Sequence, residues 1–145
     1  MARTQSAGVI LYRYGDAGLE LLLVHPGGPF WARRDDGAWS MPKGEFAESE
    51  RAEDAARREL AEEIGVVCDR LEPLFPVRYA DASTQLIGRA FLAYHDGPVV
   101  LQASEIVEGA FVPIVEAERI MRDERCCPDG AEVLRRYLAG ARPAD

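Results

Sequence analysis

Two apolar runs separated by a turn-forming cluster open the chain. Residues 7–14 include four consecutive apolar side chains, and residues 19–25 form a compact aliphatic run. Between them, Gly15-Asp16-Ala17-Gly18 has the composition of a tight turn. This arrangement predicts a β-hairpin over residues 7–25.

A helical period follows over residues 49–64. Apolar side chains recur there at spacings of three and four residues and form one stripe: Ala52, Ala55, Ala56, Leu60 and Ile64. Ser49 is the expected N-cap, and Gly65 suits the left-handed position that ends a helix. The stripe predicts that this helix packs against a sheet.

The rest of the chain alternates between strand-like and helix-like segments. Strands are expected at residues 71–79, which two prolines interrupt, and at 86–95, 99–101 and 109–114; helices are expected at 115–122 and 129–138. This order of elements predicts an α/β fold, a three-layer α/β/α sandwich. With 145 residues, of which 48% are hydrophobic, the chain can bury one sizeable core, so residues 1–145 are expected to form a single domain.

Charge and cysteine content narrow the classes of partner. The formal net charge of −8 disfavours duplex nucleic acid as an electrostatically held partner. No apolar run is long enough to span a membrane, and the N-terminus lacks the apolar centre of a signal peptide. Three cysteines, two of them adjacent, suit neither a disulfide framework nor a zinc site. A protein of the reducing cytoplasm, with no membrane partner, is therefore expected.

One run of 23 residues carries the candidate chemistry. It reads Gly44, five residues, Glu50, seven residues, then Arg58-Glu59-Leu60-Ala61-Glu62-Glu63-Ile64-Gly65-Val66. A chance match to its seven specified polar or glycine positions is expected less than about once in ten million starting points. The run resembles the signature of the Nudix hydrolases and departs from it at no position. That resemblance implies a Nudix-like α/β/α sandwich with a mixed β-sheet.

The glutamates of this run are spaced to share one side of a helix. Glu59, Glu62 and Glu63 stand at i, i+3 and i+4, so on a helix their like charges lie close together. These charges repel one another unless a cation binds between them. Carboxylate oxygens are hard ligands that suit Mg²⁺ or Mn²⁺, and either ion is the expected cofactor. Gly44 lets the backbone approach the metal or a diphosphate where a Cβ would intrude. The alternative is a solvated, glutamate-rich helix face.

The Nudix resemblance implies further roles. Arg58 pairs with the Glu50 carboxylate and holds the catalytic loop on the helix, so that both residues orient the site. Water attacks a phosphorus of a diphosphate bridge, and a carboxylate takes the proton from that water. In the family this base is either a glutamate of the signature or one on a distant loop. Glu105 and Glu108 precede a strand in the manner of that loop; Glu105 is the preferred base, and two exposed surface glutamates are the alternative.

Substrate contacts are expected from basic residues near the signature. Lys43 directly precedes Gly44 and can contact a phosphate as a point charge. Arg33 and Arg34, with two aromatic residues, lie in a loop-like segment over residues 26–37, where they can grip a base or phosphate. The equally weighted alternative is that the arginines are solvated and Trp31 covers the edge of the core. Glu108 is kept as a further candidate for substrate contact.

The function that the resemblance implies is hydrolysis of the diphosphate (pyrophosphate) linkage in a nucleoside diphosphate joined to another group. The partner is then a small nucleotide or diphosphate substrate. Two alternatives stay open: a non-catalytic Nudix domain that senses a nucleotide, and an enzyme like the isopentenyl-diphosphate isomerases. The intact signature disfavours both, because such proteins commonly lose parts of it. Dimers are common in the family and a homodimer is left open, although no apolar seam in the sequence indicates one.

Overall fold

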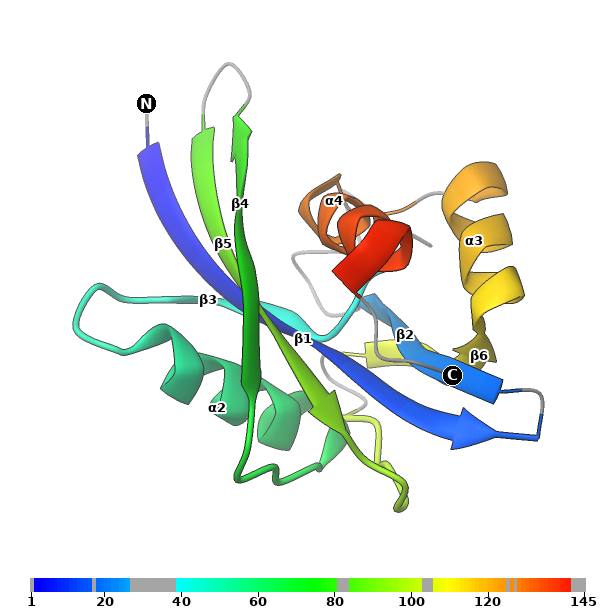
Figure 1. Ribbon diagram of the computed structural model, residues 1–145. Helices are drawn as coiled ribbons and strands as arrows, with labels where there is room; N and C mark the ends of the chain where they lie inside the picture. The colour runs from blue at the N-terminus through cyan, green and yellow to red at the C-terminus, as the bar shows by residue number, and fades with distance from the viewer. Residues whose placement is uncertain are drawn as a thin grey trace.

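The computed structural model describes residues 2–16, 18–26, 39–80, 84–102, 106–124, 126 and 128–141. Within these residues, six strands form one mixed sheet: β1 (Ala2–Gly15), β2 (Gly18–Pro26), β3 (Lys43–Phe46), β4 (Glu72–Ala80), β5 (Thr84–Tyr94) and β6 (Ile106–Pro113). The strand order is β4-β5-β1-β2-β6, and β3 pairs with β1. Helix α2 (Ala52–Ile64) lies on one face of the sheet, whereas α3 (Ile114–Asp123) and α4 (Pro128–Arg136) lie on the other (Figure 1). The expected α/β/α sandwich is confirmed.

The predicted hairpin and the interrupted strand are both present. β1 and β2 pair in antiparallel fashion up to Gly15 and Gly18, and Gly18 has a positive φ of 106° that favours glycine. β4 pairs with β5, and its register shifts between Pro73 and Pro76. Proline has no N–H to donate to a ladder, so the two prolines account for the irregularity.

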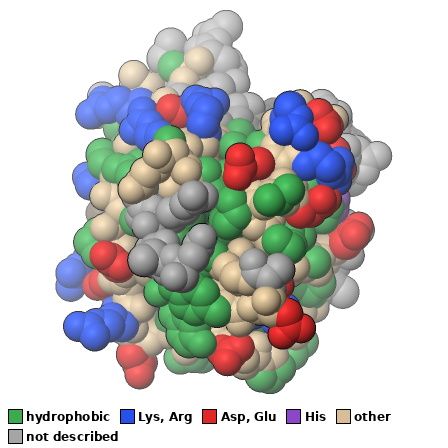
Figure 2. Space-filling model, turned by 45° about the vertical axis from the view of Figure 1, so that its right-hand side comes forward, with side chains coloured by type: hydrophobic (Ala, Val, Ile, Leu, Met, Phe, Trp, Pro, Cys, Tyr) green, Lys and Arg blue, Asp and Glu red, His purple; other side chains and the backbone are tan. Residues whose placement is uncertain are grey.

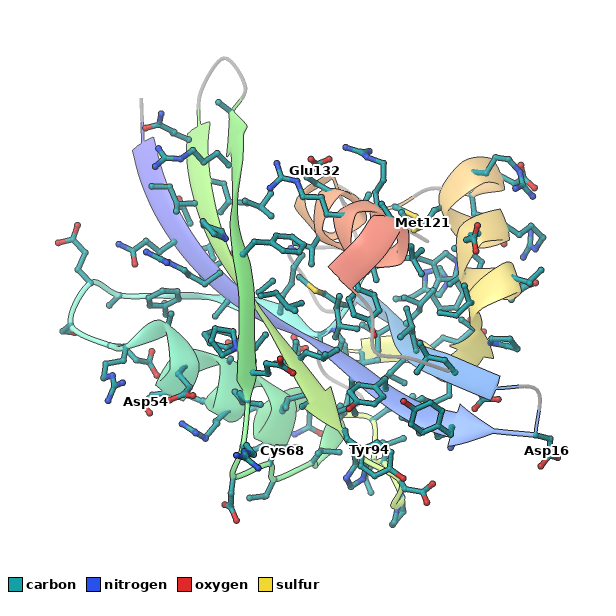
Figure 3. All side chains as sticks on the ribbon, viewed as in Figure 1. Asp16, Asp54, Cys68, Tyr94, Met121 and Glu132 are labelled. Atoms are coloured by element: carbon teal, nitrogen blue, oxygen red, sulfur yellow. The ribbon has the colours of Figure 1, made fainter. Side chains whose placement is uncertain are left out.

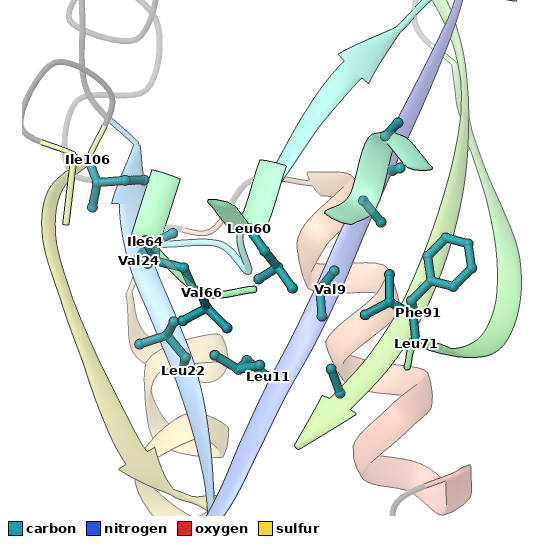
Figure 4. Close-up of a cluster of buried hydrophobic side chains, with 14 residues drawn as sticks. Val9, Leu11, Leu22, Val24, Leu60, Ile64, Val66, Leu71, Phe91 and Ile106 are labelled. Atoms are coloured by element: carbon teal, nitrogen blue, oxygen red, sulfur yellow. The ribbon is translucent and has the colours of Figure 1, made fainter. Parts of the chain in front are cut away.

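Two apolar layers follow from the alternation of side chains along β1. Val9 and Leu11 pack toward α2, whereas Ile10 belongs to the layer beneath α3 and α4. Figure 4 shows Leu60 and Ile64 of α2 among the strand residues of the first layer. Both side chains are fully buried, so the helical stripe predicted from the sequence is the surface that fixes α2 to the sheet.

Helix α2 begins later than the sequence indicated. Its N-cap is Arg51, in extended conformation and without a side-chain capping bond, so the assignment of Ser49 as N-cap is wrong. The backbone N–H of Glu50 donates instead to the carbonyl of Ala47. Residues 47–50 therefore form a turn before the helix, although the sequence predicted that the helix begins there. The predicted end is confirmed, because Gly65 adopts the left-handed conformation with φ 66° and ψ 25°.

The expected strand over residues 99–101 is not present. The N–H of Val100 donates to the carbonyl of Ile64 at 2.9 Å, and the N–H of Gln102 donates to that of Glu63 at 2.8 Å. Carbonyls in the last turn of a helix need such outside partners. The segment therefore closes the C-terminal end of α2 rather than extending the sheet.

The C-terminal helices are confirmed, with small changes in their bounds. α4 continues into a short π-helical turn, η1 (Tyr137–Ala141). Val133 and Leu134 of α4 and Tyr137 of η1 are buried. Of the helices that the structure describes, none is both long enough and apolar enough to cross a membrane.

Candidate functional site

Strand β3 brings Gly44 against the helix that carries the glutamates. Gly44 pairs with Ala7 of β1, in the centre of the sheet, while α2 packs on that same side. A Cβ built on Gly44 would overlap the carboxyl group of Glu59. Only glycine at this position lets the β3 backbone and the Glu59 carboxylate lie so close together.

The three signature glutamates differ in exposure. Glu59 and Glu63 are buried, with 7% and 9% of their surface exposed, whereas the side chain of Glu62 is half-exposed. Burying a carboxylate costs free energy unless a cation or hydrogen bonds compensate it. Two such groups one turn apart, beside Leu60 of the core stripe, therefore indicate a site rather than an ordinary solvated helix face.

Arg58 connects the loop before α2 to these glutamates. Its Nε donates to Oε2 of Glu50 at 3.1 Å and its Nη2 donates to Oε1 of Glu50 at 3.0 Å, a two-point contact. Its Nη1 donates to Oε1 of Glu59 at 3.1 Å and to Oε2 of Glu62 at 3.4 Å. The hydrogen bond from Arg58 lowers the pKa of the Glu50 carboxyl, and the same bond raises the pKa of Arg58.

The Glu50–Arg58 contact should make stability depend on acid pH. Because the folded pKa of Glu50 lies below the ordinary 4.5, the contact stabilises the fold above about pH 5 and is lost as the pH falls through the lowered value. Urea denaturation from pH 7 to pH 3 should show that Glu50→Gln is less stable than the wild type near neutrality. The two should converge in acid.

Glu48→Gln is a matched control, because Glu48 is an exposed glutamate in the same turn. Its unfolding free energy should follow that of the wild type across this pH range. A difference between Glu50→Gln and wild type that persists unchanged at pH 3 would contradict the assignment of the acid dependence to Glu50.

The donor set fits a hard divalent cation, although it is not a ready-made cage. Over residues 39–80 and the other described ranges, no three histidine, cysteine, aspartate or glutamate side chains are grouped closely enough to hold an ion. Arg58 instead engages oxygens of Glu59 and Glu62. Two buried carboxylates and a glycine backbone that touches one of them still supply the oxygen ligands that Mg²⁺ or Mn²⁺ prefers.

The structure describes two of the five other candidate residues, Lys43 and Glu108. Glu105, Arg33 and Arg34 lie outside the described residues. Lys43 starts β3 opposite Gly8 and is partly buried, directly before Gly44. Glu108 is exposed and lies opposite His25 in the β2–β6 ladder.

The register of β2 shows which face Glu108 occupies. Val24 packs toward α2, so the next side chain, His25, lies on the opposite face. The ring of His25 lies against that of Trp39, with centroids 3.6 Å apart, and Trp39 packs on the layer beneath α3. Glu108 therefore shares a face with His25 and not with the glutamates of α2.

A polar contact around Trp39 was not foreseen from the sequence. Trp39 Nε1 donates to Oε1 of Glu124 at 3.1 Å, and Arg119 Nη2 donates to Oε2 of the same carboxylate at 2.7 Å. Val24 and Ser40 exchange two backbone hydrogen bonds of 2.8 Å. The two ends of the segment between Pro26 and Trp39 are thus held together and tied to α3. Nothing in the sequence indicated this contact, because Trp39 and Glu124 lie 85 residues apart.

Comparison with known proteins decides the family. The family model described as NUDIX domain matches residues 2–137. This chain belongs to the Nudix family. An uncharacterized Nudix hydrolase of Pseudomonas aeruginosa is 33% identical over 103 residues, which cover 70% of this chain and 61% of that relative. An RNA pyrophosphohydrolase of Erythrobacter litoralis is 38% identical over 85 residues, which cover 53% of this chain and 51% of that protein.

This Nudix chain therefore spans little more than half the length of these curated relatives. Among solved structures, the NUDIX domain of Shewanella oneidensis NrtR complexed with ADP ribose matches with a TM-score of 0.78 and 22% identity, covering 98% of this chain and 90% of that one. A MutT protein from Methanosarcina mazei matches with a TM-score of 0.77 and 20% identity, covering 98% and 97%. At these identities the likeness shows the Nudix fold.

Proposed function

We propose that this chain is a metal-dependent hydrolase that cleaves the diphosphate linkage of a nucleoside diphosphate joined to another group. The observation that carries the proposal is the close approach of Gly44 to the buried Glu59 carboxylate, with Glu63 buried one turn away. Arg58 and Glu50 hold the loop and the helix in this arrangement.

The roles follow from these positions. Glu59, Glu62, Glu63 and the Gly44 carbonyl would hold Mg²⁺ or Mn²⁺, and the ion would supply Lewis acidity at the phosphate oxygens and lower the pKa of the attacking water. Arg58 fixes the orientation of the glutamates through Glu50. Lys43, and with it Arg33 and Arg34, contact the phosphates of the substrate.

We assign the base that takes the proton from the attacking water to Glu105. The alternative, Glu108, lies opposite His25 on the other face of the sheet. A carboxylate within hydrogen-bond reach of the attacking water can accept its proton, either directly or through one intervening water.

The cytoplasm fits the cysteines that the structure describes. Cys68 and Cys126 are both free, and burial raises the pKa of each thiol, so both stay protonated near neutral pH. Unreactive, reduced thiols suit a compartment in which disulfides do not form.

The test is metal-dependent turnover of a substrate panel. The purified chain is incubated with Mg²⁺ or Mn²⁺ and with ADP-ribose, diadenosine polyphosphates, nucleotide sugars, normal and oxidised nucleoside triphosphates, and an RNA oligonucleotide with a 5′-triphosphate. The RNA and ADP-ribose are included because they match the chemistry in the names of an RNA pyrophosphohydrolase relative and an ADP-ribose complex of the same fold. Chromatography should show release of a mononucleotide or pyrophosphate that EDTA stops and added Mg²⁺ restores.

Reaction in ¹⁸O-labelled water then identifies the attacked phosphorus from the product that carries the label. Tight binding of a nucleotide with no turnover in any reaction would favour a nucleotide-sensing domain. Turnover that persists in EDTA would contradict the metal-dependent mechanism.

A further inference from the structure

Helix α4 touches the segment that leads into β3. The backbone of Gly130, in the first turn of α4, lies against Ser40, and both residues are buried. A Cβ built on Gly130 would lie 2.7 Å from Oγ of Ser40, 3.6 Å from its Cβ and 3.7 Å from its Cα. The first of these distances is shorter than real Cβ contacts, so the close approach of α4 to Ser40 requires glycine.

The side of α4 that makes this contact faces away from solvent. Gly130 precedes Glu132 by two residues, which places the two on opposite sides of a helix. Figure 3 shows Glu132 on the side of α4 away from the strands, and Arg136 donates to its carboxylate at 3.1 Å. Figure 2, which turns the right-hand side of Figure 1 forward, shows acidic and basic side chains side by side at its upper right. Exposed ion pairs of this kind contribute little, so the contact with Ser40 is what distinguishes α4.

Ser40 is held from several directions. Its backbone N–H and C=O both bond to Val24 of β2, at 2.8 Å each, and its hydroxyl donates to the carbonyl of Met41 at 2.9 Å. None of the surface of Ser40 is exposed, so its hydroxyl cannot turn out into solvent. A methyl group added to Gly130 would therefore displace the backbone around Ser40 rather than move a flexible side chain aside.

Each residue from Ser40 to Gly44 is attached to the sheet. Met41 is buried, and its Cε lies 2.6 Å from the position of a Cβ on Gly8 of β1. The carbonyl of Pro42 accepts a hydrogen bond from β1 at 3.0 Å, and the next residue opens the ladder between β3 and β1. The segment contains no loop that could absorb a shift at Ser40. Such a shift is taken up by the paired segment as a whole, which includes Gly44.

We infer that the contact between Gly130 and Ser40 positions Gly44 against Glu59, so that Gly130 and Ser40 are positioning residues of the site. The inference rests on the proposed function, in which the Gly44 carbonyl and the Glu59 carboxylate are ligands of a divalent cation. A Cβ on Gly44 would overlap that carboxyl, so the backbone and the carboxylate are already in close contact. Because α4 and α2 lie on opposite faces of the sheet (Figure 1), an effect of α4 on the glutamates passes through residues 40–44.

The test begins with Gly130→Ala. This variant should weaken Mn²⁺ binding and lower the turnover number, each by about 10-fold, the lower end of the loss seen when a group that orients a metal ligand is changed. Calorimetric titration measures the Mn²⁺ affinity, and steady-state kinetics measure the turnover number. An affinity and a turnover number that both equal those of the wild type would overturn the inference.

A second substitution should reverse the effect. Ser40→Ala removes the hydroxyl that the new methyl group would overlap, and the nearest remaining side-chain atom, Cβ of residue 40, lies at an ordinary contact distance of 3.6 Å. The double variant should therefore recover most of the Mn²⁺ affinity and turnover that Gly130→Ala loses. Equal losses in Gly130→Ala and in the double variant would contradict the assignment of the effect to this contact.

Leu19→Ala separates positioning from a general loss of stability. Leu19 is buried at the hairpin end of β2, five residues before Val24, and its truncation leaves a cavity. The melting temperature of Leu19→Ala should fall at least as far as that of Gly130→Ala, while its Mn²⁺ affinity stays near that of the wild type. If Mn²⁺ affinity fell equally in both variants, affinity would simply follow stability, and the positioning role would be refuted.

NMR of the metal-free protein tests the coupling without the proposed activity. The amide signals of Gly44 and of Ala7, its partner in β1, should shift in Gly130→Ala and return toward their wild-type positions in the double variant. Unshifted signals would overturn the inference whatever the activity. Shifted and restored signals in a protein that binds no Mn²⁺ would support the coupling and refute the proposed metal-dependent function. If Gly130→Ala does not fold, Ser40→Cys, which places a larger sulfur atom against Gly130, supplies the same measurements.

Discussion

Replacing Glu62 with glutamine is expected to lower the turnover number by at least about 100-fold, while the protein stays folded. Losing an outer-shell partner of a metal already costs 10–100-fold, so loss of a direct ligand should cost at least as much. The side chain of Glu62 is half-exposed, so the change opens no cavity, and Arg58 keeps its contacts with Glu50 and Glu59. Steady-state kinetics measure the turnover number, and calorimetric titration with Mn²⁺ measures the metal affinity.

Glu53→Gln is the matched control on the same helix. Glu53 lies in the first turn of α2, where it pairs with Arg57 at 3.4 Å and lies outside the proposed site. Its turnover and Mn²⁺ affinity should stay near those of the wild type. If Glu62→Gln retained full activity, Glu62 could not be a metal ligand, and the role assigned to the glutamates of α2 would need revision.

Gly44→Ala is expected to lower both metal affinity and turnover by at least about 10-fold. The added methyl group would overlap the Glu59 carboxyl, which is the flexible end of a side chain and is therefore the part that moves. Displacing this carboxylate removes one ligand from its place, while overpacking lowers the unfolding free energy by about 1–3 kcal/mol. Kinetics at saturating Mn²⁺ separate weaker metal binding from misplaced chemistry.

Gly140→Ala is the corresponding glycine control. A Cβ at Gly140 meets no heavy atom within 4 Å, and its φ of 177° is extended backbone that alanine adopts. Activity and stability should both be close to those of the wild type. An active Gly44→Ala with unchanged Mn²⁺ affinity would show that contact between Gly44 and Glu59 is not needed.

The parts of the fold that were predictable depend on local patterns. The hairpin turn, the apolar stripe of α2 and the left-handed Gly65 each depend on residues close together in the sequence, and each prediction is confirmed. The Nudix resemblance depended on one continuous run of residues, and the family match confirms it.

The errors arose where distant partners decide local structure. Residues 99–101 are apolar and strand-like, but the N–H groups of Val100 and of the following Gln102 donate to carbonyls of α2 more than 35 residues earlier. The short strand β3 was not predicted, because its four residues form a strand only through pairing with β1. Ser49 has the chemistry of an N-cap, yet the turn closed by Glu50 and Ala47 moves the helix start to Ala52.

The candidate site also has parts that were predictable from nearby residues and parts that depend on distant ones. The contact between Arg58 and Glu50 lies within the signature and was expected from the resemblance; the structure contains it. The face on which Glu108 lies depends on its register with β2, and a shift between His25 and Pro26 changes which side chains of β6 face α2. Spacing along the sequence cannot reveal such a shift.

The bonds from Val100 and Gln102 to the last carbonyls of α2 join that loop and the turn bearing Glu63 into one unit of local opening. Amide protons at both positions should exchange with solvent only when the helix end itself frays. Insertions should therefore be tolerated at some positions of this loop and not at others. Extra residues near Gly97 leave those two amides in place, whereas a single insertion between Val100 and Gln102 would pull on the backbone that positions Glu63.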